Sequence, residues 1–195
     1  MESFDAYLRE AEIAHGHLCA GQVLGVRMAI AGLSRLGIED PRGADRKRLI
    51  TYVEIDRCAT DAIAVVTGCR LGKRALKFFD WGKMAATFVD LQSGRAVRVS
   101  ARESSKEAAR QLHPELDNKN AQQMLAYREM KDEDLFQFQN VCVEVRPKDL
   151  PGFKGERIVC SKCGEGINFH REVRCDDQIL CRACSGESYY SVVEG

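Results

Sequence analysis

The sequence lacks a long hydrophobic run, a leader-like N-terminus and an excess of charge of either sign. The most apolar stretches, residues 23–33 and 62–66, are far shorter than the roughly 18 residues of a membrane-spanning helix, and Arg27 interrupts the first. The first 17 residues are acidic and amphipathic, which is not the pattern of a secretory signal. We therefore expect a cytoplasmic protein that has no membrane partner.

The balance of charge also argues against a nucleic-acid partner for the chain as a whole. Lys and Arg together number 29, as do Asp and Glu, so the formal net charge is zero and no overall field attracts a polyanion. Cofactor fingerprints are missing as well: residues 1–150 contain neither a Rossmann loop nor the four-cysteine spacing of an iron–sulfur protein. The sequence thus gives no independent catalytic signature, and whether the protein is an enzyme stays open.

Cysteine, in contrast, is abundant, with nine residues. In a reducing cytosol, thiols arranged in C-x-x-C pairs are metal ligands more often than disulfides. Five of the nine lie between Cys160 and Cys184, and four are scattered through the first 150 residues. Because a segment containing two prolines and Gly152 (residues 147–154) precedes the cluster, we predict two domains, residues 1–150 and 151–195.

Hydrophobic periodicity predicts an α+β fold with a mixed or antiparallel sheet and packed helices. The expected helices span residues 2–14, 20–36 and 61–67, with one or two more within 103–130. The expected strands are 49–55, 84–91, 95–101 and 136–146, of which the middle two form a hairpin. The 20–36 helix has a row of small residues that would admit a neighbouring backbone. This row, together with the hinged cysteine segment, predicts a homodimer.

The C-terminal cysteines form the pattern Cys160-x2-Cys163-x17-Cys181-x2-Cys184. Two C-x-x-C pairs can complete a tetrahedron around one zinc ion, and four thiolates leave no open coordination position, so this zinc would be structural. We expect a small treble-clef or zinc-ribbon-like finger with a hairpin between residues 167–173 and 178–180. His170 and Cys175 lie within the same loop, and either is an alternative to one of the four ligands.

A zinc finger raises the question of nucleic-acid binding. Residues 151–195 contain six basic and seven acidic side chains. A net charge of −1 provides no patch to neutralise phosphates, so a nucleic-acid partner is disfavoured.

A second concentration of metal-binding side chains lies near the N-terminus, where His15, His17 and Cys19 fall within five residues. An extended segment would project all three to one side, whereas a helix would place only His15 and Cys19 on a shared face. We expect His17 and Cys19 to converge with Cys58, with His15 as the alternative imidazole. Zinc suits such mixed ligation best, and nickel or iron are alternatives.

Neighbouring groups would support this core site. Asp61 is expected to orient a ligand histidine. Cys19 and Cys58 each stand where a helix should begin, which would favour their thiolate forms. The alternatives to a metal site are histidines hydrogen-bonded within the core and thiol-based catalysis.

Residues 67–73 resemble a phosphate-binding loop only superficially. One residue too few separates Gly68 from Gly72, and the segment follows a helix rather than a strand, so we reject a P-loop. Lys73 and Lys83 can still meet an anionic ligand.

Four short motifs together resemble the FmdE family, which is named for the FmdE component of formylmethanofuran dehydrogenase, a molybdenum or tungsten enzyme. The motifs are His15-Gly-His17-x-Cys19-x-Gly21, Asp56-Arg57-Cys58-x-x-Asp61-Ala62, Thr67-Gly68-Cys69-x-x-Gly72-Lys73 and Asp80-x-Gly82-Lys83. The resemblance spans roughly residues 10–145, and the cysteine module matches the zinc finger that many members append. One departure is Ala20, where the family usually has proline.

The resemblance implies an α+β core with a His/Cys metal site, a C-terminal zinc finger and a dimer. It also implies a metal-binding accessory protein of a molybdenum or tungsten oxidoreductase complex. The main alternative is a stand-alone metal- or thiol-dependent enzyme or metal-handling protein, and a zinc-finger regulator of nucleic acid is the third.

Overall fold

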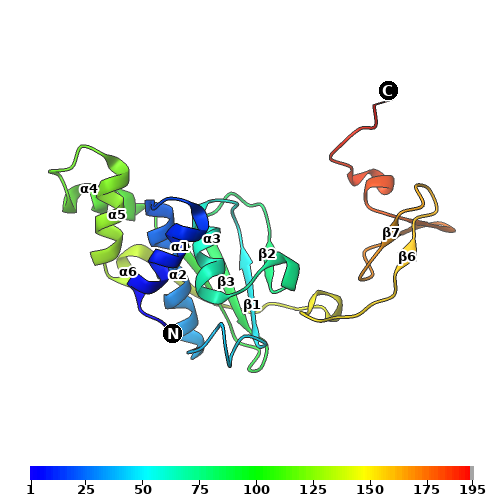
Figure 1. The fold of residues 1–195 in the computed structure, drawn as a ribbon, viewed down its shortest axis with the longest axis horizontal. Coiled ribbons are helices and arrows are strands. Elements are labelled where there is room, and N and C mark those ends of the chain that lie inside the picture. The colour runs from blue at the N-terminus through cyan, green and yellow to red at the C-terminus, as the bar shows by residue number, and fades with distance from the viewer. Residues whose placement is uncertain (194–195) are drawn as a thin grey trace. The chain divides into compact units, whose positions relative to one another are not determined.

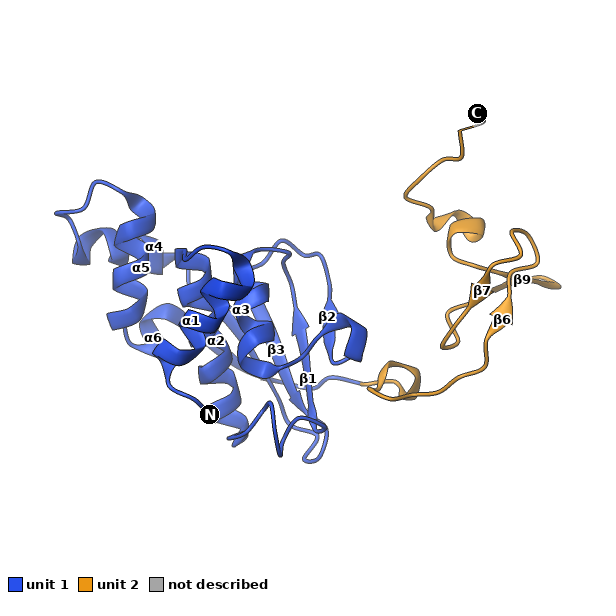
Figure 2. Cartoon of the chain, in the orientation of Figure 1, with its two compact units in different colours: residues 1–144 blue, residues 145–195 orange. Residues whose placement is uncertain are grey.

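The computed structural model describes residues 1–193 and divides into two compact units, Met1–Glu144 and the residues from Val145 onward (Figure 2). The helices of the first unit are α1 (Phe4–His15), α2 (Ala20–Leu36), α3 (Cys58–Thr67), α4 (Ser104–Leu112), α5 (Lys119–Glu129) and α6 (Asp132–Leu135), all labelled in Figure 1. Its strands are β1 (Leu49–Val53), β2 (Leu76–Phe78), β3 (Ala85–Asp90), β4 (Ala96–Ala101) and β5 (Phe136–Val141), and the short 3-10 turn η1 (Leu71–Lys73) precedes β2. Among the described residues, the helices lack the length and hydrophobicity of a membrane span.

The five strands form one mixed sheet in the order β2-β1-β3-β4-β5. Only β1 and β2 are parallel, and the other three pairings are antiparallel. Every residue of β3 is buried, as expected for a strand in the middle of a sheet. The expected α+β class with a mixed sheet and packed helices is therefore confirmed.

Helix α2 is the centre of the core, because it contacts β3 and β4 on one side and α1, α3 and α5 on others. Its small residues make these contacts close. A Cβ atom at Gly25 would lie 2.5 Å from the carbonyl oxygen of Ala59 in α3, and one at Gly32 would lie 2.3 Å from the Phe88 ring in β3. The small-residue row therefore admits a neighbouring backbone as expected. It does so within one chain, so it no longer supports a dimer.

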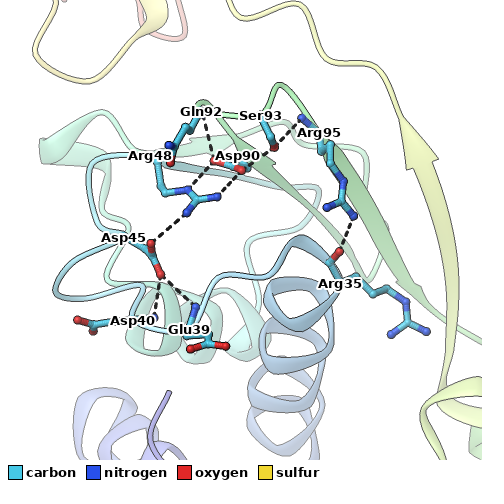
Figure 3. Close-up of polar contacts among 9 residues, drawn as sticks. All are labelled: Arg35, Glu39, Asp40, Asp45, Arg48, Asp90, Gln92, Ser93 and Arg95. Atoms are coloured by element: carbon cyan, nitrogen blue, oxygen red, sulfur yellow. Dashed lines mark hydrogen bonds and ion pairs between the residues drawn. The ribbon is translucent and has the colours of Figure 1, made fainter.

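Polar side chains connect the β3–β4 hairpin to the loop that precedes β1 (Figure 3). Arg48 donates to both carboxylate oxygens of Asp90 at 2.8 and 2.6 Å. The same carboxylate accepts from the backbone N–H of Gln92 and from the Ser93 hydroxyl within the turn. Asp90 is fully buried, so the pairing with Arg48 compensates the cost of removing its charge from water.

The second unit contains short elements in place of a large core. It begins with the 3-10 turn η2 (Pro147–Asp149), continues through the paired strands β6 (Ile158–Val159) with β7 (Gly166–Ile167) and β8 (Val173–Cys175) with β9 (Gln178–Leu180), and ends with the helical turn η3 (Ala183–Glu187). Among its described residues, three hydrophobic side chains are buried, those of Cys160, Ile167 and Leu180. A core this small needs a covalent or metal staple to hold its shape.

The structure corrects several predicted boundaries. Strand β1 ends at Val53 rather than at residue 55, and β5 ends at Val141 rather than at residue 146. Helix α3 begins at Cys58, three residues early, because Arg57 is the last extended residue. Strand β2 was not predicted. In the second unit, the predicted strand over 167–173 is wrong, because Phe169 and His170 both have positive φ values that no strand accommodates.

Candidate metal centres

The four C-terminal cysteines come together in the second unit. Their sulfur atoms all lie within 4.8 Å of one another, and those of Cys163 and Cys181 are 3.9 Å apart. A tetrahedron with zinc–sulfur bonds of about 2.3 Å has sulfur–sulfur edges of about 3.8 Å. The cluster thus has the size of a four-thiolate zinc site. His170 and Cys175 are not members of it.

Local backbone geometry positions these thiols. The turn between β6 and β7 presents the first pair and is closed by a hydrogen bond from Gly164 N–H to the carbonyl of Cys160, with Gly164 at a φ of 76°. The second pair joins the end of β9 to η3. The order of elements in this unit is therefore knuckle, hairpin and helical turn. Backbone amides also point at sulfur, from Cys181 to Cys160 at 3.2 Å and from Cys184 to Cys181 at 3.4 Å.

The thiols of the cluster differ in pKa. Backbone N–H groups of Cys163 and Cys181 donate to Cys160 and lower the pKa of its thiol to about 6. The hydrogen bond with Cys181, followed by burial and the other neighbouring thiols, raises the pKa of Cys184 to about 12. Four thiolates this close repel one another, so a bound cation is what allows all of them to ionise. The donor set therefore fits zinc.

The N-terminal cluster consists of His15, His17 and Cys19, whose ligand atoms also lie within 4.8 Å of one another. Helix α1 ends at His15 because Gly16 adopts a φ of 93°. The chain then runs without helical structure to Cys19, the N-cap of α2. The ring centroids of His15 and His17 are 4.7 Å apart. The turn, rather than one continuous strand or helix, is what brings both imidazoles to the thiol.

Asp61 in α3 fixes the orientation of His15. Its Oδ2 atom lies 2.8 Å from Nδ1 of His15. A carboxylate only accepts hydrogen bonds, so Nδ1 carries the proton and Nε2 is left as the ligand atom. This pairing of a ligand histidine with a carboxylate is common around protein metal sites, and the structure places Asp61 where the sequence predicted it.

Cys58 lies beside this cluster but outside the group of three. A Cβ atom at Gly21 would lie 3.2 Å from Cβ of Cys58 and 3.7 Å from Sγ of Cys19, so the two cysteines border the same glycine. Burial raises the pKa of the Cys58 thiol, and a hydrogen bond with Cys19 raises it further. The expectation that the start of α3 favours a Cys58 thiolate is therefore not supported, because burial outweighs the backbone hydrogen bond at the helix start.

One residue near the core site gave no signal in the sequence. The side chain of Asn120 in α5 accepts a hydrogen bond from the backbone N–H of Ala20 at 3.1 Å. Cys19 makes no side-chain cap of its own on α2, so Asn120 supplies the cap from a distance of 100 residues. Only the folded arrangement of α2 and α5 shows this.

The fold and the two clusters define an α+β protein with two groups of His and Cys side chains that can hold a metal ion. The chain belongs to the FmdE family, described as "FmdE, Molybdenum formylmethanofuran dehydrogenase operon", which it matches over residues 14–137. The family identified from the four motifs is thus confirmed.

Two relatives extend the comparison. A curated protein of Archaeoglobus fulgidus, named a probable S-adenosyl-L-methionine-binding protein, is 34% identical over 211 residues. The match includes 95% of this chain but only 54% of the relative, so the chain spans about half of that protein's length. A crystal structure of a tungsten formylmethanofuran dehydrogenase FmdE-like protein from Syntrophus aciditrophicus superposes with a TM-score of 0.64 at 24% identity, covering 97% of this chain and 96% of that one. This second likeness shows a shared fold.

Proposed function

We propose that this chain is a metal-binding accessory protein with one structural zinc and one reactive transition-metal site. The observation that carries the proposal is the convergence of two separate sets of ligand atoms, each within 4.8 Å. In the second unit, Cys160, Cys163, Cys181 and Cys184 would hold zinc. In the first unit, His15, His17 and Cys19 would hold zinc or another transition metal.

The two sites differ in the number of coordination positions that they leave open on the metal ion. Four cysteines complete the coordination of a tetrahedral ion, so the metal they bind only stabilises the fold. His15, His17 and Cys19 provide three ligands, which leaves one position for water, a substrate or the neighbouring Cys58. Zinc, nickel and iron all accept mixed imidazole and thiolate ligands. The core site therefore has the composition of a reactive metal centre.

The accessory role is inferred from membership of the FmdE family. The partner would be a molybdenum or tungsten oxidoreductase. The test is whether molybdenum or tungsten, measured by elemental analysis, co-elutes with the tagged full chain during size-exclusion chromatography of an extract from its own cells. The proposal expects a molybdenum- or tungsten-containing peak at a mass above that of the chain. Elution of the chain with neither element would contradict the accessory role and leave the metal sites as they are.

Cobalt substitution tests the core site itself. Cobalt bound through cysteine gives a sulfur-to-metal absorption band, so Cys19→Ser in the full chain should reduce this band and remove the core contribution. The matched control is Cys142→Ser, because Cys142 is an exposed cysteine outside both clusters. Equal spectra for wild type and Cys19→Ser would contradict the core site.

A second candidate, a metal-dependent enzyme that acts alone, is favoured by the open coordination position. Azide is a suitable probe, because it can enter an open position on cobalt but not a site that four protein ligands already fill. A spectral shift on azide addition would support a reactive centre. An unchanged spectrum that becomes responsive in Cys58→Ser would show that Cys58 is the fourth ligand.

We further propose that the protein works as a cytoplasmic homodimer. The supporting observation is an exposed aromatic patch formed by Phe78, Phe79 and Trp81 at β2, an edge strand of the sheet. Large apolar groups clustered at an edge are typical of contact surfaces. Light scattering at micromolar concentration should give twice the chain mass, and Trp81→Glu should give the monomer mass. A monomeric wild-type chain would contradict the dimer.

A further inference from the structure

A small, positively charged pocket lies in the first unit apart from both metal clusters. The cavity has a volume of about 190 Å³ and is lined by Glu10, Arg42, Arg46, Val65, Gly68, Arg70 and Lys73. Four of these residues are cationic and one is acidic, although the chain as a whole has no net charge. Positive charge is therefore concentrated here.

The cationic side chains of the pocket differ in whether carboxylates neutralise their charge. Arg42 is held by Glu10 and Glu2, so two carboxylates already balance its charge. Arg46, Arg70 and Lys73 are exposed, and no ion pair joins any of them to an acidic group among the described residues. Three uncompensated cations thus share one cavity, which raises the local concentration of anions.

Backbone geometry gives the pocket its shape. Helix α3 ends at Gly68, whose φ of 66° belongs to the left-handed region, and the chain turns there towards η1. A Cβ atom at Gly68 would lie 3.1 Å from Cγ of Arg42, so glycine allows the Arg42 stem to lie against the end of the helix. Arg42 is thereby positioned by a carboxylate pair on one side and by the α3 terminus on the other.

The size and the lining select the class of ligand. Pockets for drug-sized molecules measure about 300–1,000 Å³, so this cavity suits a single small group. Guanidinium groups match the oxygens of phosphate in a bidentate manner, and lysine adds a point charge. A single apolar residue, Val65, lines the cavity, which leaves little surface for a base or an acyl chain.

We propose that this pocket binds a phosphate group, supplied either as free inorganic phosphate or as the phosphate of a small monoester. Arg46, Arg70 and Lys73 would contact the oxygens, and Arg42, which is already paired with Glu2 and Glu10, would form one wall of the pocket. The site is independent of the metal clusters and of the proposed accessory role. It gives a function to Lys73 without a P-loop.

The test is a titration of inorganic phosphate into the zinc-loaded full chain at constant ionic strength, followed by calorimetry and by amide chemical shifts. Saturable binding should shift the amides of Gly68 and Lys73 but not those of His17 and Cys19. A parallel titration with glycerol phosphate separates the two sources. If the two compounds bind with equal affinity, the free anion is sufficient as the ligand. If glycerol phosphate binds more tightly than inorganic phosphate, the ligand is a monoester.

Charge reversal provides the control. Lys73→Glu should weaken phosphate binding by about tenfold or more, since it replaces a charge-assisted contact with a repulsive one. Arg70→Glu should do the same independently. Lys47→Glu makes an identical change at an exposed lysine outside the pocket and should alter the affinity by less than about twofold. An equal loss in Lys47→Glu would overturn the proposal, as would wild-type protein that shows no saturable binding up to about 10 mM phosphate. In that case the cations only stabilise the C-terminus of α3.

Discussion

The carboxylate of Asp61 contributes to the core site without being one of the three candidate ligands. It accepts from Nδ1–H of His15, which holds the imidazole in one tautomer with Nε2 directed away from the carboxylate. Without this partner, the ring would be free to rotate and to exchange tautomers before it binds a metal. Loss of the Asp61 carboxylate should therefore lower metal affinity rather than the stability of the fold, because the Asp61 side chain is 57% exposed.

Asp61→Ala should therefore weaken zinc binding at the core site by about tenfold or more. Competition with a chromophoric chelator measures this affinity in the full chain. Asp56→Ala, which removes an exposed carboxylate from the same segment, is the matched control and should bind zinc as the wild type does. The two variants should melt at nearly the same temperature. Equal zinc affinities would show that Asp61 does not position His15.

Asp90 is a second residue whose role depends on one partner, and here the consequence is a pH dependence. The hydrogen bonds from Arg48 hold the pKa of Asp90 well below its ordinary value. A depressed folded-state pKa stabilises the protein fully above the unfolded-state pKa of about 3.9, and this contribution is lost as the pH falls through the folded-state value.

Asp90→Asn should lower the melting temperature at pH 7 by several degrees, since it leaves the Arg48 guanidinium without its buried partner. The difference between variant and wild type should shrink as the pH falls below about 4. Glu103→Gln, which removes a carboxylate from an exposed pair with Lys106, should change the melting temperature little at any pH. A difference that stays constant down to the lowest measurable pH would contradict this role of Asp90.

Helices α2 and α5 cap each other. Asn120 from α5 accepts from the first N–H of α2. In return, Arg27 from α2 donates to the carbonyls of Tyr127 and Met130 near the end of α5, at 2.7 and 2.8 Å, and pairs with Asp132 in α6. Helix ends leave such backbone groups without partners. Because Cys19 directly precedes α2, this arrangement connects a candidate metal ligand to the packing of α5.

Asn120→Ala should destabilise the fold by about 1 kcal/mol and should also weaken metal binding at the core site, because the start of α2 loses its cap. Asn118→Ala is the matched control. The side chain of Asn118 caps α5 by accepting hydrogen bonds from the backbone N–H groups of Asn120 and Ala121. Its loss should therefore cost about the same stability and leave metal affinity unchanged. Thermal unfolding and chelator competition measure the two quantities separately. Equal affinities for both variants would contradict the link between α5 and Cys19.

The elements also show how much the sequence could predict. Helix α2 was predicted to the residue, because a continuous apolar pattern runs up to Gly37, which ends the helix at a φ of 70°. The β3–β4 hairpin was predicted within one residue at each end. Strand β2 was missed because three residues are too short for alternation to be visible, and its pairing with β1 is a tertiary contact.

The candidate site was predictable to a similar extent. Local spacing predicted that His17 and Cys19 lie together, with His15 as the alternative imidazole, whereas Cys58, the predicted third member, lies outside the group of three. The C-x-x-C pairs identified the second cluster. The raised pKa of Cys58 and the cap from Asn120 were not predictable, because burial and contacts between distant segments determine both. The phosphate pocket likewise combines residues from α1, the loop before β1 and the end of α3.

In the whole molecule, the folding of the two units should depend on metal to different degrees. The first unit has a continuous hydrophobic core, whereas three residues form that of the second. Metal binding should therefore supply most of the folding free energy of the second unit and little of the first.

Cys181→Ser should abolish amide protection beyond about residue 155 while leaving the first unit folded, as measured by hydrogen exchange in the full chain. Cys175→Ser removes an exposed cysteine outside the cluster and should preserve protection throughout. If a chelator or Cys181→Ser left the second unit protected, its stability would not depend on the ion.

Metal stoichiometry decides whether one chain holds two metal ions at two separate sites. The full chain, reconstituted with zinc and freed of excess metal, should contain two ions per chain by elemental analysis. The double variant His17→Ala/Cys19→Ser and the single variant Cys181→Ser should each contain one. A wild-type ratio of one, unchanged in His17→Ala/Cys19→Ser and reduced to zero in Cys181→Ser, would show that the core site does not bind metal.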